Sequence, residues 1–464
     1  MRPLLAPLLA LLVAGCVAGP DYRIPGKAMI NQGGAKAPFL GDKTKGLARA
    51  ALPAHWWRLY NDQQLDVLVA AALRANTDLR SAAANLRRAS ILIREAEAAR
   101  IPTTDISGQT TGARLGGPTR FLPAPFSYAL GISASYPLDL AGGIRRGIEA
   151  ANAQAEAARA ARDQVRVVVA AAVARSYARV CADGVALTAA RRVVAIQQAT
   201  LNVARHMARA GRGTRFDIDR ADAAASTSEA VIPDILADRR TALFMLATLM
   251  GRVPSDYPRR LEECATIPSL SRPLPVGDGA MLLMRRPDVR RAERLLAEAT
   301  AGIGVARADL YPKVSLGGSA GTNTSVGHAL SLSSFGVSVG PMISWSFPNR
   351  VLARVKIDEA DTQAEAALAA FDGAVLLALQ QTETALSAYT RTQERLDVLE
   401  RAAQSTSRAS DEARLLQRFG RTPFLNVLNA QASYANAQTH LSSARIDLID
   451  RQIDLFLALG GGWE

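Results

Sequence analysis

The sequence contains few of the residues on which metal sites, disulfide scaffolds and many enzymes depend. Its 464 residues include three cysteines and four histidines, and the histidines at 55, 206, 328 and 440 lack the spacing of a metal site. Aromatic residues make up 5% of the chain and hydrophobic residues 49%, which favours long helices rich in alanine and leucine over an aromatic-cored β protein. We therefore predict a mainly helical chain without a metal site.

Long hydrophobic runs are missing as well, since no window of 18 or more residues is purely apolar. This excludes an ordinary transmembrane helix, which needs about 20 predominantly apolar residues. Charged residues make up 21% of the chain, which argues against extensive disorder, and the net charge of +13 fits proteins that bind nucleic acid. The N-terminal sequence, however, predicts export from the compartment that holds nucleic acid.

The first sixteen residues have the form of an export signal. A basic start at Met1-Arg2 precedes an apolar run at Leu4–Val13, which has the length of a signal-peptide core and is too short to cross a bilayer. The run ends in Leu12-Val13-Ala14-Gly15-Cys16, which resembles the lipobox of bacterial lipoproteins. We predict a signal peptide at 1–15 and attachment of diacylglycerol and an N-acyl chain to Cys16, with no other cofactor. The alternative is an ordinary secretory leader with an incidental cysteine.

The residue after this cysteine bears on the final location of the protein. In such lipoproteins an aspartate there usually marks retention in the inner membrane, so Val17 predicts the outer membrane. Cys181 and Cys264 would then be the only free thiols, in an oxidising periplasm. A disulfide between them is one option, although two separate buried thiols are the commoner arrangement.

The most informative feature of the remaining chain is an internal repeat. Residues 211–221 (Gly-Arg-Gly-Thr-Arg-Phe-Asp-Ile-Asp-Arg-Ala) align with residues 420–430 (Gly-Arg-Thr-Pro-Phe-Leu-Asn-Val-Leu-Asn-Ala) at an offset of 209. Pro102 and Pro312, each ahead of a stretch rich in Ser, Thr and Gly, are 210 positions apart. Two anchors with nearly the same offset predict a duplicated unit of helix, two strands, long helix, turn and helix.

Two segments predict unusually long helices. Residues 144–210 contain no proline and few glycines, and at about 1.5 Å per residue a helix over this range is roughly 100 Å long. Residues 351–419 repeat the pattern. Because a bilayer core is only about 30 Å thick, most of each helix must lie outside it. Twelve of the 25 residues between 150 and 174 are alanine, which favours a wall of closely packed helices over a two-stranded coiled coil or bundle with a leucine seam.

Four segments alternate between apolar and small or polar residues with a period of two. In residues 126–136 one face carries Phe, Tyr, Leu, Ile, Ala and Tyr, and the other carries only Ser, Ala and Gly. Residues 335–347 are divided similarly, and the segments near 104–112 and 313–322 are weaker examples. This pattern is typical of a transmembrane β-barrel, whereas a strand of a soluble sandwich would place Lys, Glu or Arg on its second face.

Four strands from one chain cannot close a barrel. Open strand edges in a bilayer leave unpaired N–H and C=O groups that cost several kcal/mol each, and the smallest bacterial barrels use about eight strands. The chain is therefore predicted to complete its barrel with further copies of itself. This argument alone allows two, three or more copies.

Several motifs resemble the TolC-like outer-membrane factor family, in particular its NodT-type efflux lipoproteins. The strongest are Leu283-Met-Arg-Arg-Pro-Asp-Val-Arg-Arg-Ala-Glu293 and Ile303-Gly-Val-Ala-Arg-Ala-Asp-Leu-Tyr-Pro312, and further matches are Cys16–Tyr22, His55–Trp57, Tyr136–Leu140 and Ala458–Trp463. The resemblance covers nearly the whole mature chain. It implies a homotrimer, mainly α with a small β part, in which a twelve-stranded outer-membrane β-barrel is continuous with a twelve-helix periplasmic α-barrel.

The resemblance also implies the role of exit duct in a tripartite efflux pump. The partners would be a periplasmic adaptor (a membrane fusion protein) and an inner-membrane transporter of the RND type, which supplies the energy, and nucleic acid is not a partner. The chain would then be a passive conduit and not an enzyme. The alternatives are a periplasmic adaptor, which would need a lipoyl-like or β-barrel soluble domain between its hairpin halves, and a structural lipoprotein without a channel.

These signals divide the chain into six parts. They are a signal peptide at 1–15, a lipidated periplasmic segment at 16–61, a first repeat at 62–250 with strands at about 103–139, a linker at 251–286 in the equatorial region, a second repeat at 287–460 with strands at about 313–347, and a tail at 461–464. Pro287 suits the first position of a helix, and Asp288 suits its positive end.

The resemblance places the two aligned turns at the distal ends of the long helices, where family members meet their adaptor. The adaptor-facing residues would be Gly211, Thr214, Gly420 and Thr422. Six and nine residues after each turn glycine the family often carries aspartates that ring the periplasmic aperture, and these positions hold Asp217, Arg220, Asn426 and Asn429. Because amides do not concentrate cations as carboxylates do, strong cation selectivity is not expected.

Two further hypotheses concern these hairpins. Arginines crowd both tips, and this collar would hold a closed state through contacts with Asp217 and dock an acidic adaptor hairpin; the alternative is that the arginines only solvate a helix face. The collar consists of Arg205, Arg209, Arg212, Arg215, Arg414, Arg418 and Arg421. Pro233, whose counterpart in the second repeat is Ser442, predicts a kink in one copy only.

Overall fold

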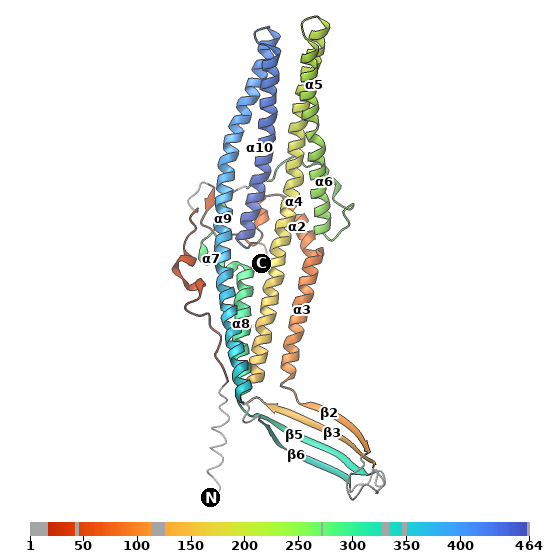
Figure 1. Cartoon of the computed structure of the whole chain (residues 1–464), viewed down its shortest axis with the longest axis vertical. Coiled ribbons are helices and arrows are strands. Elements are labelled where there is room, and N and C mark those ends of the chain that lie inside the picture. The colour runs from red at the N-terminus through yellow and green to blue at the C-terminus, as the bar shows by residue number, and fades with distance from the viewer. Residues whose placement is uncertain are drawn as a thin grey trace. The chain divides into compact units, whose positions relative to one another are not determined.

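The computed structural model of the protein describes residues 17–41, 46–112, 126–270, 272–325, 334–345 and 350–461. The predicted signal peptide, the predicted lipidation site Cys16 and the last three residues of the predicted tail lie outside this range. Helices dominate the described residues and a four-stranded sheet is the main β element (Figure 1). This confirms the prediction of a mainly α fold with a small β part.

The order of the elements repeats along the chain. The first half contains α2 (Gln63–Ala75), α3 (Thr77–Ala98), β2 (Thr103–Gly112), β3 (Phe126–Leu138), α4 (Gly143–Arg209), α5 (Arg215–Glu229) and α6 (Val231–Leu249). The second half contains α7 (Gly279–Arg285), α8 (Pro287–Ala308), β5 (Lys313–Ser325), β6 (Phe335–Ser344), α9 (Arg350–Arg418) and α10 (Phe424–Ala458). Each half thus has two shorter helices, two strands, one long helix and the second arm of a helical hairpin. This second arm is α5 and α6 in the first half and α10 in the second, and the order is the predicted one.

Shorter elements lie in the N-terminal segment and in the predicted linker. They are the strands β1 (Leu47–Ala48) and β4 (Leu274–Pro275), which pair in parallel, and the 3₁₀ helices η1 (Met29–Asn31), η2 (Gly33–Lys36), η3 (Trp56–Tyr60) and η5 (Arg259–Glu263). The boundaries assigned to the two repeats and to the linker stay predictions.

The chain divides into two compact units. The first contains the N-terminal residues up to Ala28, Asn85–Arg159 and Arg291–Asp372, and it therefore holds the four-stranded sheet. The second contains Met29–Ala84, Ala160–Arg290 and the chain from Gly373 onward, and it holds the two helical hairpins whose turns lie at residues 210–214 and 419–423.

The sheet of the first unit is antiparallel throughout, with the order β2-β3-β5-β6. Its register aligns Ile106 with Ile132, Ile132 with Ala320, and Ala320 with Val337, so apolar side chains from all four strands share one row. Among the described residues, β2 and β6 each have a strand partner on one side only. The sheet of a single chain therefore has two open edges.

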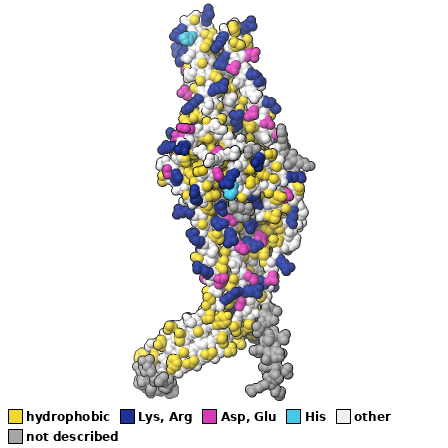
Figure 2. Space-filling view, turned by 180° about the vertical axis from the view of Figure 1, so that it is seen from behind, with side chains coloured by type: hydrophobic (Ala, Val, Ile, Leu, Met, Phe, Trp, Pro, Cys, Tyr) yellow, Lys and Arg dark blue, Asp and Glu magenta, His cyan; other side chains and the backbone are white. Residues whose placement is uncertain are grey.

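The two faces of the sheet differ as the alternating sequence predicts. The apolar face is exposed in the single chain, with Ile106 78% and Val339 80% accessible, and hydrophobic side chains gather over the sheet in Figure 2. The opposite face carries small residues such as Ser133, Ser319 and Gly321, and residues of this face line a depression of about 450 Å³. The apolar face of the sheet is thus suited to contact with lipid, and the opposite face borders an open depression.

The second unit has a hydrophobic core built around the Trp-Trp motif. Trp56 is fully buried and its ring stacks on that of Phe456 in α10, with the ring centroids 4.4 Å apart. Leu65 of α2 and Leu246 of α6 are buried in the same cluster. Gly461 fits against Trp56 and Leu52, where an added Cβ would lie 2.6 Å from a Leu52 methyl group. Motifs from both ends of the chain therefore meet in one core.

The helix break in the first hairpin lies beside Pro233. Helix α5 ends at Glu229 and α6 begins at Val231, whereas the counterpart α10 runs without interruption from Phe424 to Ala458. Proline has no amide hydrogen, so the carbonyl four residues earlier loses its helical partner. The helix is thus interrupted in one copy only, at the place where Pro233 predicts a kink, and the predicted restart of a helix at Thr77 after Asn76 is confirmed.

Part of one helix is apolar enough for a membrane span, although it contains no purely apolar window of 18 residues. Within α9, an 18-residue window has a mean hydropathy of 1.3 with at most two charged residues. The helix has 69 residues, whereas a span needs about 20. By length and composition alone part of α9 could cross a bilayer, so the sequence-based exclusion of such a helix was too broad.

Cys181 of α4 and Cys264 form a disulfide bond, so the expectation of two separate buried thiols was wrong. The reason lies one turn further along α4, where Gly184 has no side chain to keep the loop away. A Cβ at this position would lie 2.0 Å from the carbonyl oxygen of Cys264. Arg239 of α6 adds a hydrogen bond of 2.9 Å to the same oxygen. The glycine and the arginine together bring the loop within bonding distance of the helix.

Replacing both cysteines by alanine should lower the free energy of unfolding by about 2–4 kcal/mol, because the bond closes a loop between residues 83 positions apart. Denaturant titration of the purified protein measures this loss. The wild-type protein in reductant should unfold at the same lower denaturant concentration. Alkylation of both thiols without reductant would contradict the bond itself.

Candidate functional site

The two turns that the repeat aligns have the same backbone structure. Gly211 and Gly420 have φ values of 71° and 69°, in the left-handed region that glycine adopts without strain. The next amides reach back to close the helices, with Arg212 N–H donating to the Met207 carbonyl and Arg421 N–H to the Leu416 carbonyl, both at 2.9 Å. Each long helix therefore ends in a glycine C-cap, and the chain reverses there.

Asp217, the first predicted aperture residue, is tied to the start of its own helix. Its Oδ2 accepts hydrogen bonds from the amide and the hydroxyl of Thr214, at 2.9 and 2.7 Å. The Thr214 oxygen in turn accepts from the Asp217 amide at 3.2 Å, which completes a capping box. The bonds from Thr214 hold the pKa of Asp217 below its usual value, and Arg220 adds a smaller effect in the same direction.

Replacing Thr214 by alanine should loosen the start of α5. Loss of such a cap costs about 1 kcal/mol, which corresponds to about fivefold faster hydrogen exchange of the first amides of the helix. Because the pKa of Asp217 is lowered in the folded state, its contribution to stability is present above the unfolded value of 3.8 and is lost as the pH falls through the lowered pKa. The difference in exchange rate between wild type and variant should therefore be largest at pH 7 and smaller in strong acid, where the bond from the Asp217 amide to the Thr214 oxygen remains.

The second hairpin provides a matched control. Thr422 accepts a hydrogen bond of 2.9 Å from the side-chain amide of Asn426, a pair without an acidic group. No side chain caps the first amides of α10, so replacing Thr422 by alanine should leave their exchange nearly unchanged at both pH values. Identical exchange of wild type and Thr214→Ala at pH 7 would overturn the capping role of Thr214.

The remaining predicted aperture residues also make local contacts. The guanidinium of Arg220 lies over the ring of Phe216, 5.5 Å from its centroid. Asn426 is held by Thr422, as described above. Asn429 is exposed, and its backbone carbonyl accepts a hydrogen bond from Ser433. The aperture positions thus lie on the first turns of α5 and α10, directly behind the tip glycines.

The arginine collar does not contact Asp217 in the way that was expected. Arg205 forms an ion pair of 3.5 Å with Asp222, and Arg414 pairs with Asp411. Among the ion pairs of the described residues, none involves Asp217. The hypothesis of Arg–Asp217 contacts is therefore wrong for the single chain, because the nearby hydroxyl of Thr214 satisfies the carboxylate first.

A buried polar contact that no sequence motif predicts joins the two hairpins. Gln431 of α10 is 1% exposed, and its amide donates to the hydroxyl of Thr200 in α4 at 2.7 Å. Small and apolar residues surround the site, including Leu201, Ala221 and Leu428. The only signal in the sequence is the position of Gln431 one residue past the aligned block. The contact links the hairpins through side chains near their tips.

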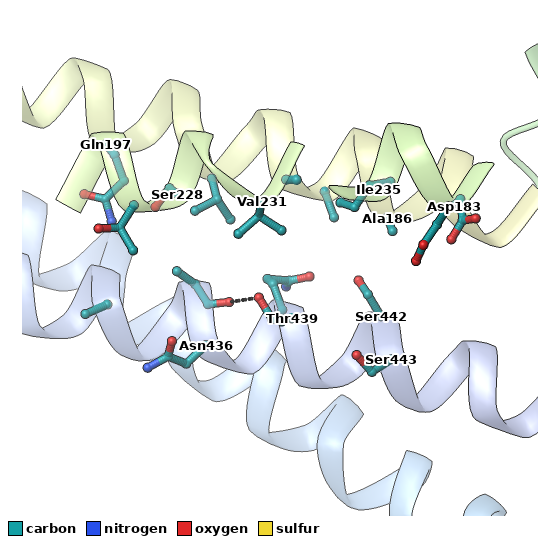
Figure 3. A pocket seen from close by; sticks show the side chains of 18 of the residues that line it. Asp183, Ala186, Gln197, Ser228, Val231, Ile235, Asn436, Thr439, Ser442 and Ser443 are labelled. Carbon is teal, nitrogen blue, oxygen red and sulfur yellow. Dashed lines mark hydrogen bonds between the residues drawn. The ribbon is translucent and has the colours of Figure 1, made fainter. Parts of the chain in front are cut away.

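A groove of about 470 Å³ lies between the hairpins of the second unit. Val231 and Ile235 from one hairpin face Thr439 and Ser442 of α10 across it (Figure 3). At one end the groove reaches Asp183, which is buried. Burial raises the pKa of Asp183 to about 6, although the neighbouring guanidinium of Arg179 opposes this change. The groove is therefore lined by methyl groups, hydroxyls and side-chain amides such as those of Gln197 and Asn436, with an acid–base cluster at its end.

The described residues contain no group of three or more His, Cys, Asp or Glu that could hold a metal ion. Two of the described histidines have other partners: His55 packs edge-on against Trp57, and His206 contacts Arg209. The two hairpin tips thus carry helix-capping groups, side-chain amides and arginines. Such groups can bind a partner protein or line an opening.

Comparison with known proteins identifies the family. The model of the family described as "Outer membrane efflux protein" matches residues 68–252 and 280–461. Nodulation protein T of Rhizobium leguminosarum bv. trifolii is 29% identical over 99% of this chain and 97% of its own length. The solvent efflux pump outer membrane protein SrpC of Pseudomonas putida is 30% identical over 99% of this chain and 98% of its own.

Solved structures agree with these relatives. The outer-membrane channel OprN is 33% identical, with a TM-score of 0.88 over 97% of this chain and 100% of the other. The open state of the MtrE outer membrane channel of Neisseria gonorrhoeae is 28% identical, with a TM-score of 0.80 over 97% and 99%. These findings confirm the resemblance to TolC-like outer-membrane efflux proteins drawn from the motifs, and they are not those of an enzyme family. The chain belongs to the outer membrane efflux protein family.

Proposed function

We propose that this protein is the exit channel of a tripartite efflux pump and conducts small molecules passively through the outer membrane. The observation that carries the proposal is the open four-stranded sheet, with its exposed apolar face and the single-sided pairing of β2 and β6 in the described chain. Lipid suits the apolar face but cannot pair an open edge. The sheet therefore fits a membrane only as part of a larger barrel.

The barrel is proposed to contain three chains and twelve strands, with β6 of one copy beside β2 of the next. Two copies would give eight strands, and a barrel of that size has an interior that side chains fill. Twelve strands leave room for a passage, which the small residues Ser133, Ser319 and Gly321 would line. In three copies, α4, the α5–α6 arm, α9 and α10 would supply the twelve helices of a periplasmic tunnel.

Lipidation of Cys16 by diacylglycerol and an N-acyl chain is proposed to anchor each copy in the outer membrane. The support is the lipobox sequence and the valine that follows the cysteine. Several acyl chains anchor a protein far more stably than one, since each buried methylene contributes about 0.8 kcal/mol.

The partners are proposed to be a periplasmic adaptor and an inner-membrane transporter of the RND type. The adaptor would meet the turns that contain Gly211, Thr214, Gly420 and Thr422. The arginine collar supports this placement, because exposed guanidinium groups attract an acidic hairpin. Behind the turns, Asp217, Arg220, Asn426 and Asn429 would surround the periplasmic aperture.

Ion conductance across a planar lipid bilayer tests the proposed channel. The purified acylated protein should produce discrete current steps of uniform size. An adaptor or a structural lipoprotein would produce none, so the absence of current from a protein that remains folded would overturn the proposal. Addition of a periplasmic adaptor should then change the conductance of the open channel but should not change that of a protein with all seven collar arginines replaced by glutamine.

A further inference from the structure

The residues directly after Cys16 are docked against the first unit even though they form no regular secondary structure. The amide of Ala18 donates to the carbonyl of Ala141 at 2.9 Å, in the short connection between β3 and α4. The hydroxyl of Tyr22 donates to Glu293 of α8 at 2.6 Å. Residues 17–22 are therefore fixed at both ends, and we refer to them as the strap.

Arg146 of α4 forms the centre of this contact. It is only 3% exposed, and its guanidinium donates to the carbonyls of Ala18 and Gly19, both at 3.1 Å. The same group donates to Asp21 at 2.8 Å and to Glu149 at 2.6 Å. Four of its five N–H groups are thus used. Two of the four bonds go to backbone oxygens that an irregular segment would otherwise leave to water.

Glycines shape the slot that receives the strap. Gly19 has a φ of 85°, and a Cβ there would lie 2.5 Å from the Cα of Gly304 in α8. A Cβ on Gly304 would lie 2.6 Å from the side chain of Arg146. A Cβ on Gly142 would lie 2.8 Å from a methyl group of Val17. Three close approaches of this kind indicate a fitted site for these six residues.

We propose that the strap and Arg146 hold the lipid-bearing end of the chain at the β3–α4 junction, with Arg146 as a positioning residue. Val17 is bonded directly to Cys16, so a docked Val17 leaves the acyl chains no flexible tether. The junction lies between β3, which is proposed to cross the membrane, and α4, which is too long to lie within it. The acyl chains would enter the bilayer at this border. This inference rests on the proposed lipidation of Cys16.

A spin label measures the position of the strap. Replacing exposed Arg23 by cysteine provides one reactive thiol, because Cys181 and Cys264 are bonded to each other and Cys16 carries lipid. In nanodiscs, the label should be strongly immobilised and should report a single depth. Arg146→Gln should give a mobile spectrum and a spread of depths, and the Ala18 amide should exchange at least tenfold faster, while Arg146→Lys should restore part of the order.

Arg145→Gln is the matched control, because Arg145 is the adjacent arginine and its side chain is 59% exposed. The spin-label spectrum of this variant should equal that of the labelled Arg23→Cys parent protein. Should Arg146→Gln fail to fold, Gly19→Ala displaces the strap without altering α4 and should give the same mobile spectrum. An immobile label in both variants, or a mobile label in the parent, would overturn the proposal. The mass of the N-terminal peptide reports lipidation independently, and conductance reports the channel, so the failure of either is distinguishable from a failure of the strap.

Discussion

Replacing Val339 by arginine should prevent assembly of the channel in the outer membrane. Val339 lies in the middle of β6, is 80% exposed in the single chain and belongs to the apolar face. An arginine on the lipid face of a barrel costs about 2–4 kcal/mol near the middle of the membrane, and the cost arises once in each copy. The measurement is the amount of heat-resistant oligomer recovered from outer-membrane fractions.

The neighbouring residue provides the control for this substitution. Ser338 points to the opposite face, where its hydroxyl lies 2.8 Å from that of Ser319. Arginine at this position should allow assembly and reduce the single-channel conductance, because it would enter the passage. Equal assembly of Val339→Arg and Ser338→Arg would mean that the two faces of the sheet are not divided between lipid and water.

Replacing Arg286 by methionine should lower the free energy of unfolding by about 3–5 kcal/mol, which is typical of removing one partner from a buried ionic network. Arg286 is 6% exposed and donates to the carbonyl of Ala458 and to Gln381, both at 2.8 Å. It also donates to Asp288 at the start of α8. One side chain thus ties the end of α10 to α9 and to the Arg-Pro-Asp motif.

Chemical denaturation of the purified protein measures this effect. Arg252→Met is the control, since Arg252 is half exposed and its ion pair with Asp256 spans 3.7 Å. Such a surface pair contributes about 0–1 kcal/mol. If the two variants lost equal stability, the network around Arg286 would not have the structural role assigned to it.

Features set by local chemistry could be predicted from the sequence. Period-two alternation identified the four strands, because a strand places successive side chains on opposite faces. The turn glycines and Pro233 identified the hairpin ends and the helix break, because they restrict the backbone directly. The repeat offset then gave the order of the elements without any knowledge of their packing.

Features that join distant segments could not be predicted in this way. The bond between Cys181 and Cys264 depends on how closely a loop approaches α4, and only Gly184, one turn after Cys181, hinted at such an approach. The resemblance to the family places Asp217 at the aperture, which stays a prediction, but it does not show the local role of this residue. Thr214 three residues earlier offered a local partner, and a capping box satisfies both residues without help from another chain.

The central claim is that neighbouring copies pair the open edges of the sheet, and disulfide crosslinking between β2 and β6 tests it most directly. A cysteine at Ser107 would be combined in turn with a cysteine at Gly336, Ser338, Gly340 or Met342, so that each pair samples a different register on the same face. At least one combination should give a covalently closed trimer under oxidation, and either cysteine alone should give none. A protein that stays monomeric in every combination, in membranes as well as in detergent, would contradict the account.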